Sequence, residues 1–190
     1  MDDRTGPDLT GQLLIAMPNM EDTRFEGAVI FMCAHSDDGS MGLIINKVSS
    51  KIAATDVFEQ LDITPDPDMP PLDVCYGGPV EMARGFVLHS TDYACGDASL
   101  PVNDLFSMTA SRDVLRDIAA AGGPKERLLC LGYAGWSPGQ LDQEMAENAW
   151  LTCDANLQVV FHTSGPDKWT AALGLIGVNA ALLSATSGRA

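Results

Sequence analysis

The amino-acid sequence predicts a single domain of the α+β class, in which α and β structure are mixed. Its 190 residues are enough to enclose one sizeable hydrophobic core. Apolar residues make up 46% of the chain and charged residues 19%, a balance typical of globular proteins. Short apolar runs of strand length alternate with amphipathic segments that carry helix-capping residues. We expect residues 1–8 to form a flexible tail and residues 9–190 to form the domain.

The first half of the chain is expected to be mainly β structure. The turn sequence Asp37-Asp38-Gly39 lies between two apolar runs and predicts a β-hairpin. Thr55 is expected to cap a short helix, and the proline-rich residues 64–71 are expected to form a loop. The strands predicted in this half are residues 9–17, 25–34, 41–46, 74–76 and 86–89.

The stretch from residue 128 to residue 151 is the most informative part of the chain. Residues 128–131 predict a strand that is buried on both faces, and the glycines within residues 132–136 predict a tight turn after it. Ser137 is expected to cap the helix that follows. Glu144 is expected on the charged, solvent-facing side of this helix. The substitution Glu144→Gln is therefore expected to change the stability of the protein very little. By contrast, a valine at Gly135 is expected to destabilise the protein strongly.

The other elements follow the same alternation of helical and extended patterns. Ser111 is expected to cap a helix that ends before two consecutive glycines. The remaining predicted elements are a loop over residues 91–100, strands at residues 150–151 and 157–162, a helix opened by Pro166, and an irregular tail over residues 182–190.

The charge of the chain disfavours anionic partners. With 26 acidic and 11 basic side chains, the net charge is −15, which weakens generic DNA binding and attraction to anionic membranes. The densest basic cluster is interrupted by acidic residues and is interpreted as a self-neutralised surface; it consists of Arg112, Arg116, Lys125 and Arg127. No apolar run approaches the ~18 residues of a membrane span, and the first residues lack a signal-peptide pattern. We therefore expect a cytoplasmic protein without a membrane segment.

No pattern of cysteine, histidine or serine predicts a metal centre or a nucleophile. The five cysteines are scattered and odd in number, which indicates reduced thiols. Cys33 and His35 form a local pair, but a zinc site needs three or four protein ligands. Cys130 lies in an apolar run, where a thiol is a poor nucleophile. We expect no metal, no cofactor and no catalytic residue, with Cys33, Cys75 and Cys130 slow to react and Cys95 the most accessible.

Several motifs resemble the YqgE/AlgH family in order along nearly the whole chain. The strongest is Gly-Tyr-Ala-Gly-Trp-Ser-Pro-Gly-Gln-Leu, beginning at Gly132. The others are Gly-Gln-Leu-Leu-Ile-Ala-Met-Pro, Gly-Leu-Ile-Ile-Asn-Lys, Gly-Gly-Pro-Val and Gly-Phe-Val-Leu-His-Ser. The sequence departs from the family at Ala34, where a glutamate is common, and at Val48, where a proline is frequent. The resemblance implies an α+β fold with a split, strongly bent sheet that forms a pseudo-barrel flanked by helices.

Two hypotheses about function follow from the motifs. The resembled family carries the label of transcriptional regulator, and the hypothesis that we favour is a non-catalytic binding or regulatory protein with an unidentified ligand or protein partner. A homo-oligomer is compatible with the sequence. The alternative is a small-molecule or nucleotide-binding enzyme with its site near the Gly-Tyr-Ala-Gly-Trp segment, whose two aromatic rings suit either a core plug or the wall of a site. The candidate binding residues are Asn46, Gly77, Gly78, Pro79, His89, Tyr133, Gly135 and Trp136.

Overall fold

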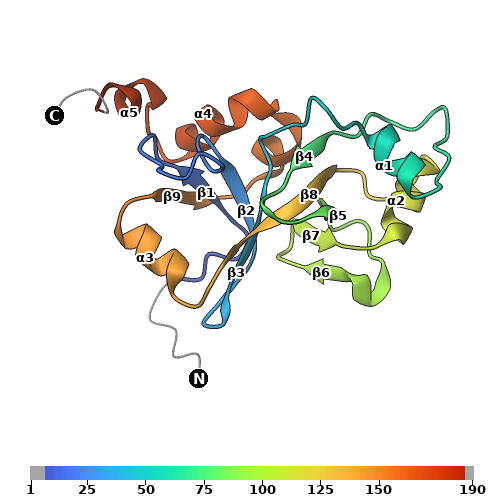
Figure 1. The fold of residues 1–190 in the computed structure, drawn as a ribbon, viewed down its shortest axis with the longest axis horizontal. Helices are drawn as coiled ribbons and strands as arrows, with labels where there is room; N and C mark the ends of the chain where they lie inside the picture. Colours follow the sequence, from blue (N-terminus) through green and yellow to red (C-terminus); the bar gives the residue numbers. More distant parts are fainter. Residues whose placement is uncertain (1–6, 187–190) are drawn as a thin grey trace.

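A bent sheet of nine strands organises the part of the chain that the computed structural model describes, residues 7–186 (Figure 1). The strand order is β6-β7-β5-β8-β3-β2-β1-β9, and β4 pairs with β8 beside this path. The strands are β1 (Gln12–Ala16), β2 (Val29–Ser36), β3 (Gly39–Ile44), β4 (Val74–Tyr76), β5 (Val80–Ser90), β6 (Ser99–Pro101), β7 (Phe106–Thr109), β8 (Arg127–Trp136) and β9 (Trp150–Asp154). The predicted fold class and the split, bent sheet are confirmed.

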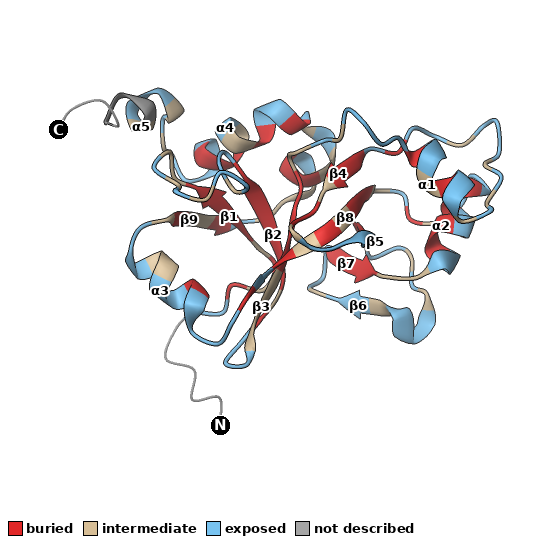
Figure 2. Cartoon of the chain, viewed as in Figure 1, coloured by how far each residue is buried: buried red, intermediate tan, exposed pale blue. Residues whose placement is uncertain are grey.

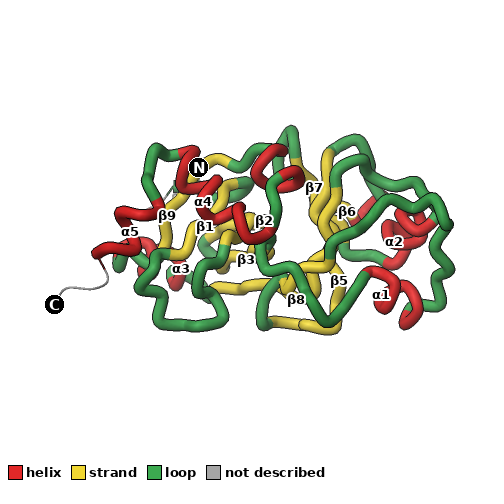
Figure 3. Tube along the Cα trace, turned by 90° about the horizontal axis from the view of Figure 1, so that it is seen from above, coloured by secondary structure: helices red, strands yellow, loops and turns green. Residues whose placement is uncertain are grey.

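Strand β8 belongs to both halves of the sheet. Its first part pairs with β5 and β4, whereas its last part pairs with β3, where Trp136 lies opposite Ser40. Helices α1 (Ala54–Gln60) and α2 (Arg112–Ala119) lie beside the half that contains β5, and α3 (Gln140–Ala146) and α4 (Gly165–Leu175) lie beside the other half (Figures 1 and 3). Helix α5 (Ala180–Thr186) follows α4 at the end of the described chain. None of the helices in the described residues is long and apolar enough to cross a membrane.

The hydrophobic core has an inner layer and two outer layers, so that most strands are buried on both faces (Figure 2). In β1, Leu13 and Ile15 pack in the inner layer, and Leu14 and Ala16 pack in the outer layer next to α3. The second outer layer lies beneath α1 and α2 and contains Phe58. Because successive strand residues point to opposite faces, an unbroken apolar run can fill two layers at once.

A glycine in the middle of β8 changes which face its side chains occupy. Before Gly132, Cys130 lies in the inner layer; after it, Tyr133 packs against that layer and Trp136 lies in the outer one. Gly132 has φ +73°, a conformation that glycine adopts without strain, and the pairing with β5 is irregular at this point. The predicted tight turn over residues 132–136 is therefore wrong. The strand continues through Gly132 with a bulge. The bulge accommodates the positive φ of Gly132, and β8 stays paired with β5 on both sides of it.

The Gly-Gly-Pro-Val segment lies directly against this bulge. A Cβ atom on Gly78 would lie 2.1 Å from the carbonyl carbon of Tyr133, and one on Gly132 would lie 2.4 Å from the carbonyl oxygen of Gly78. The N–H group of Gly77 donates a hydrogen bond of 2.8 Å to Leu131. The two glycine motifs are thus brought together by a contact between backbones, in which no side chain would fit.

Several element predictions are confirmed. Strands β2 and β3 form the predicted hairpin, with Ser36 opposite Gly39. The side chain of Ser111 accepts a hydrogen bond from Val114 and caps α2. Pro166 lies in the first turn of α4.

Several other element predictions are wrong. Residues 157–162 form a π-helical turn, Gln158–His162, because the consecutive Val159 and Val160 both enter the inner layer, which a strand does not allow. The cap of α1 is Ala53, whose N–H donates to the carboxylate of Asp56, and not Thr55.

Helix α3 begins after Gly139, which has φ +73°, so the Ser137 side chain does not cap it. Instead, the backbone N–H of Ser137 donates a hydrogen bond of 3.0 Å to the side-chain oxygen Oε1 of Gln140. The predicted loop over residues 91–100 contains a 3-10 turn, Gly96–Ala98, and the start of β6, while α5 occupies much of the predicted C-terminal tail. Residues 1–6 and 187–190 of the two predicted tails lie outside the described residues.

The contact between the glycine backbones predicts contrasting effects of two alanine substitutions. Gly78→Ala should destabilise the protein by about 3 kcal/mol or more, because the new methyl group would displace the backbone of β8. Gly174→Ala should leave stability unchanged or raise it by up to about 1 kcal/mol, because Gly174 lies in α4 with open space where the new methyl group would lie. Chemical denaturation of both variants checks this, and equal stability of the two would contradict the importance of the backbone contact.

Candidate functional site

A cavity of about 530 Å³ lies between helix α3 and residues 19–25, which follow β1. We call it the α3 cavity. The ends of three strands also contribute to its wall: the start of β5, the end of β8 and the start of β9. Its lining residues are Asn19, Met20, Glu21, Asp22, Arg24, Phe25, Pro79, Val80, Gly135, Trp136, Gln140, Glu144, Glu147, Ala149 and Trp150. The volume is within the range of small-molecule sites.

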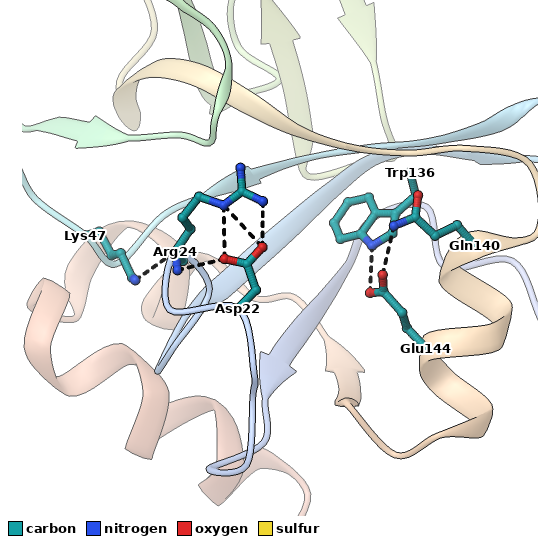
Figure 4. A network of polar contacts seen from close by, with 6 residues as sticks. All are labelled: Asp22, Arg24, Lys47, Trp136, Gln140 and Glu144. Carbon is teal, nitrogen blue, oxygen red and sulfur yellow. Dashed lines mark hydrogen bonds and ion pairs between the residues drawn. The ribbon is translucent and has the colours of Figure 1, made fainter.

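The carboxylate of Glu144 is fixed by two tryptophans in the wall of the α3 cavity. Its Oε2 atom accepts hydrogen bonds from the indole N–H groups of Trp136 at 2.9 Å and Trp150 at 2.8 Å. Its Oε1 atom accepts a bond of 3.0 Å from the side-chain amide of Gln140 (Figure 4). Both indole rings are buried and meet edge to face. Glu144 is therefore not a free side chain on the solvent face of α3, as the sequence led us to expect, but joins α3 to β8 and β9.

The wall opposite α3 is also held by specific contacts (Figure 4). The Arg24 guanidinium donates two hydrogen bonds to Asp22, of 3.0 Å from Nε and 2.6 Å from Nη2. This interaction lowers the pKa of the Asp22 carboxyl group. Lys47 donates to the carbonyl oxygen of Arg24 at 2.8 Å, and the Phe25 ring meets the edge of Trp150 at 5.9 Å between centroids. The wall formed by residues 19–25 is thus tied to both the sheet and the tryptophan pair.

The lining of the α3 cavity carries an excess of negative charge. It contains four carboxylates, on Glu21, Asp22, Glu144 and Glu147, and one guanidinium, on Arg24. Arg24 is already paired with Asp22, and none of the ion pairs formed within residues 7–186 involves the other three carboxylates. The groups that hold Glu144 are neutral donors, so its charge is stabilised but not cancelled. Such a cavity favours a cation and repels phosphate.

Three of the candidate residues predicted from the sequence, Pro79, Gly135 and Trp136, line the α3 cavity. Tyr133 does not line it. Together with Gly135 and Trp136 it borders a shallower hollow near the β2–β3 turn, and its ring packs against the edge of Phe86. Tyr133 and Trp136 are three residues apart on β8, so the alternation of side chains along the strand places them on opposite faces.

The other candidate residues have structural contacts elsewhere. Gly77 and Gly78 form the backbone contact with β8. Asn46 accepts a bond from the Val29 N–H and donates one to Gly27, both at 2.8 Å, which holds the end of the segment that forms the cavity wall. His89 is fully buried, with its ring nitrogens 2.8 Å from the Ser90 carbonyl and the Thr109 hydroxyl. Burial lowers the pKa of His89.

Sequence reasoning missed Glu144, Trp150 and the segment of residues 19–25. Two signals were available for the first two residues. The helix that contains Glu144 is bracketed by Trp136 and Trp150, and Gln140 stands one helical turn before Glu144. Residues 19–25 carried no comparable signal, because they form turns and reach the cavity only through the pairing of distant strands.

Four of the five thiols, those of Cys33, Cys75, Cys130 and Cys153, are buried. Burial raises the pKa of Cys33 to about 12. The hydrogen bond between Cys75 and Cys130 lowers the pKa of Cys75, whereas the same bond together with burial raises the pKa of Cys130. Cys95 is the only partly exposed thiol among the five. His35, the local partner of Cys33 in the sequence, instead contacts the Ser40 hydroxyl at 2.7 Å. The described residues contain no group of three or more His, Cys, Asp or Glu side chains placed to hold a metal ion.

The chain is similar to known proteins in both sequence and structure. Residues 13–181 match the model of a family described as AlgH-like. UPF0301 proteins from Jannaschia sp. (strain CCS1) and Ruegeria pomeroyi are each 54% identical over 184 residues, which is 96% of this chain and 96% and 100% of the respective relatives. The solution structure of the AlgH protein from Pseudomonas aeruginosa is 40% identical, with full coverage of both chains and a TM-score of 0.77. A crystal structure from Corynebacterium diphtheriae shares the fold at 23% identity, with a TM-score of 0.67 over 90% of this chain and 88% of the other.

The two roles of Glu144, its charge and its hydrogen bonds, can be separated by a pair of substitutions. Glu144→Gln keeps an oxygen that can accept from both indoles and should cost about 1 kcal/mol of stability, because a neutral acceptor is weaker than a charged one. Glu144→Leu should cost more, since each buried indole N–H left without an acceptor costs about 1–3 kcal/mol. Denaturant unfolding followed by tryptophan fluorescence measures both values. Equal stability of the leucine variant and the wild type would show that the two hydrogen bonds do not support the fold.

Proposed function

This chain belongs to the AlgH-like family, and from that premise we propose that it is a cytoplasmic, non-catalytic binding protein whose ligand occupies the α3 cavity. The cavity has the size of a small-molecule site and is built from ordered elements on every side. Its walls are joined by hydrogen bonds, which limits the conformational entropy that a ligand would have to remove on binding. These properties support recognition of a ligand by a preformed site.

The observation that carries the proposal is the uncompensated carboxylate of Glu144. Two indoles hold it in one position, and no cation within the described residues neutralises it. An ammonium or guanidinium group entering the cavity would gain a charge-assisted hydrogen bond to Oε1 and the field of Glu21 and Glu147. We therefore propose an organic cation as the preferred ligand class.

A regulatory role would act through this ligand or a protein partner rather than through generic contacts with duplex DNA. The net charge of −15 opposes approach to phosphates. The arginines of the basic cluster also bind other groups of the chain: Arg112 donates to Leu61, Arg116 pairs with Asp113 at 2.9 Å, and Arg127 donates to Pro124. Self-association of the chain is a further form that such a role could take. The basic cluster is also interrupted by Asp113, Asp117 and Glu126, so it offers no continuous basic face to a nucleic acid.

The alternative hypothesis, a small-molecule or nucleotide-binding enzyme near the Gly-Tyr-Ala-Gly-Trp segment, has less support. A nucleotide phosphate in the α3 cavity would face three carboxylates without basic partners. Gly132, the first glycine of this segment, is occupied by packing against Gly77 and Gly78. The organic-cation hypothesis uses the same location and agrees with its charge.

A ligand panel tests the proposal through changes in thermal stability and tryptophan fluorescence. We expect alkylamines and alkylguanidines to raise the melting temperature of the wild type, because a ligand that binds only the native state stabilises it. They should also change the fluorescence, because Trp136 and Trp150 lie in the cavity wall. Neutral analogues of the same size and nucleoside phosphates should have smaller effects.

Glu144→Gln is the decisive variant and Asp142→Asn is its matched control. Both remove one negative charge from α3, but only Glu144 lines the cavity. The effect of the cations should be lost in the first variant and kept in the second. If cations stabilise both variants as much as the wild type, the binding is non-specific attraction to an acidic protein, and the proposal is wrong.

A further inference from the structure

A second concave surface lies on the other half of the molecule, between helices α1 and α2 and the first half of β5. It is a groove of about 370 Å³, which we call the α1–α2 groove. Its lining residues are Ile52, Val57, Gln60, Leu61, Met82, Ala83, Arg84, Gly85, Ala110, Ser111, Arg112, Leu115 and Leu131. The two helices lie side by side here, far from α3 (Figures 1 and 3). The groove is therefore separate from the α3 cavity.

The apolar part of the groove is unusually open to solvent. Met82 is 59% exposed and Ile52 is 41% exposed, although both are large apolar side chains. Val57, Leu61 and Leu131 are only partly buried beside them. Contiguous exposed apolar surface on a soluble protein indicates a binding site more often than a structural role.

The charge of the groove is opposite to that of the rest of the protein. Two arginines, Arg84 and Arg112, belong to its lining, and no aspartate or glutamate does. This is notable in a chain with 26 acidic and 11 basic side chains. The two arginines of the groove attract an anion, whereas the net charge of the whole chain repels one. An anionic ligand would therefore bind at this groove in preference to the acidic surface around it.

Both guanidinium groups can still donate hydrogen bonds to a ligand. Arg112 uses its Nη2 atom to donate to the Leu61 carbonyl, and the described residues accept no other bond from it. Arg84 lies over the Phe86 ring and forms an exposed contact of 3.6 Å with Glu81, which is worth little. Ser111 and Arg112 also place the positive end of α2 at the groove. A carboxylate here would meet several donors at once.

We propose that the α1–α2 groove binds a small amphipathic carboxylate, with its apolar chain along Met82, Leu61 and Leu115 and its carboxylate at Arg84 and Arg112. The volume suits a small molecule. A carboxylate matches the planar fork of an arginine, and the apolar chain covers the exposed side chains. This site is independent of the cation proposed for the α3 cavity, and the two ligands differ in charge and in location.

Three probes with one chain length and different head groups test the proposal: decanoate, decanol and decyltrimethylammonium, all below the concentrations at which they form micelles. Calorimetry gives the dissociation constants, and NMR chemical shifts locate the site. We expect decanoate to bind at least about tenfold more tightly than decanol and to shift the resonances of residues 82–85 and 110–115. Equal affinity for decanoate and decanol, or no binding of decanoate, would overturn the proposal.

Arg84→Gln and Arg116→Gln form the matched pair of variants. Arg84 lines the groove, whereas Arg116 lies on α2 outside the lining and pairs with Asp113. Arg84→Gln should weaken decanoate binding about tenfold without changing the weaker binding of decanol, and Arg116→Gln should leave both unchanged. Arg84 makes no contact that joins the two helices, so its substitution should not open the groove. Arg112→Gln is a supporting variant, because it also removes the hydrogen bond to Leu61. Identical decanoate affinity in wild type and Arg84→Gln would show that the carboxylate lies elsewhere.

Discussion

The backbone of Gly77 and Gly78 lies directly on the backbone of Gly132 and Tyr133, and the rest of the structure depends on this contact. It inserts the connection between β4 and β5 between two other strands: the Gly77 N–H bonds to Leu131 of β8, and the Gly77 carbonyl accepts from Ile44 at the end of β3. β8 accommodates the insertion with the bulge at Gly132. That bulge moves Trp136 into the outer layer, where α3 can reach it. A packing requirement between four backbone residues therefore determines where the α3 cavity forms.

Glu144 shows how one side chain can serve the fold and a site at the same time. A carboxylate that only joined helices and strands could be replaced by an apolar group of similar shape without loss, provided that its partners were replaced as well. Here the two partners are tryptophans, whose buried N–H groups require an acceptor. An amide would satisfy them nearly as well as a carboxylate. The fold therefore needs an acceptor at this position but not its negative charge, and the proposed cation site would use that charge.

The sequence allowed the fold class, most strands and the cap of α2 to be predicted, because these depend on neighbouring residues, whereas the caps predicted at Thr55 and Ser137 were wrong. Ser111 is a helix cap within four residues of its partner, and the Asp37-Asp38-Gly39 turn joins adjacent strands. The resemblance to a family supplied the bent, split sheet. The cavity could not be predicted, because its walls meet through the pairing of β1 with β9 and of β3 with β8.

The bulge at Gly132 and the π-helical turn at Gln158–His162 were missed for a similar reason. Local patterns at these points resemble a turn and a strand, and only packing in the inner layer decides between the alternatives. Of the candidate residues, those that enter the cavity are Pro79, Gly135 and Trp136. The face that Trp136 occupies relative to Cys130 depends on the bulge at Gly132, which alternation along a regular strand does not predict.

The pairing of β1 with β9 has a consequence for the synthesis of the protein. The Gln12 side chain donates to Asp154, a residue 142 positions later, within the ladder that covers the outer edge of β1. At a translation rate of about 5–20 residues per second, β9 leaves the ribosome roughly 7–30 s after β1. During that interval β1, an apolar strand, has no partner on that side, and unpaired strand edges are prone to associate with other chains. The nascent chain therefore exposes this edge of β1 to other chains until its last strand has been made.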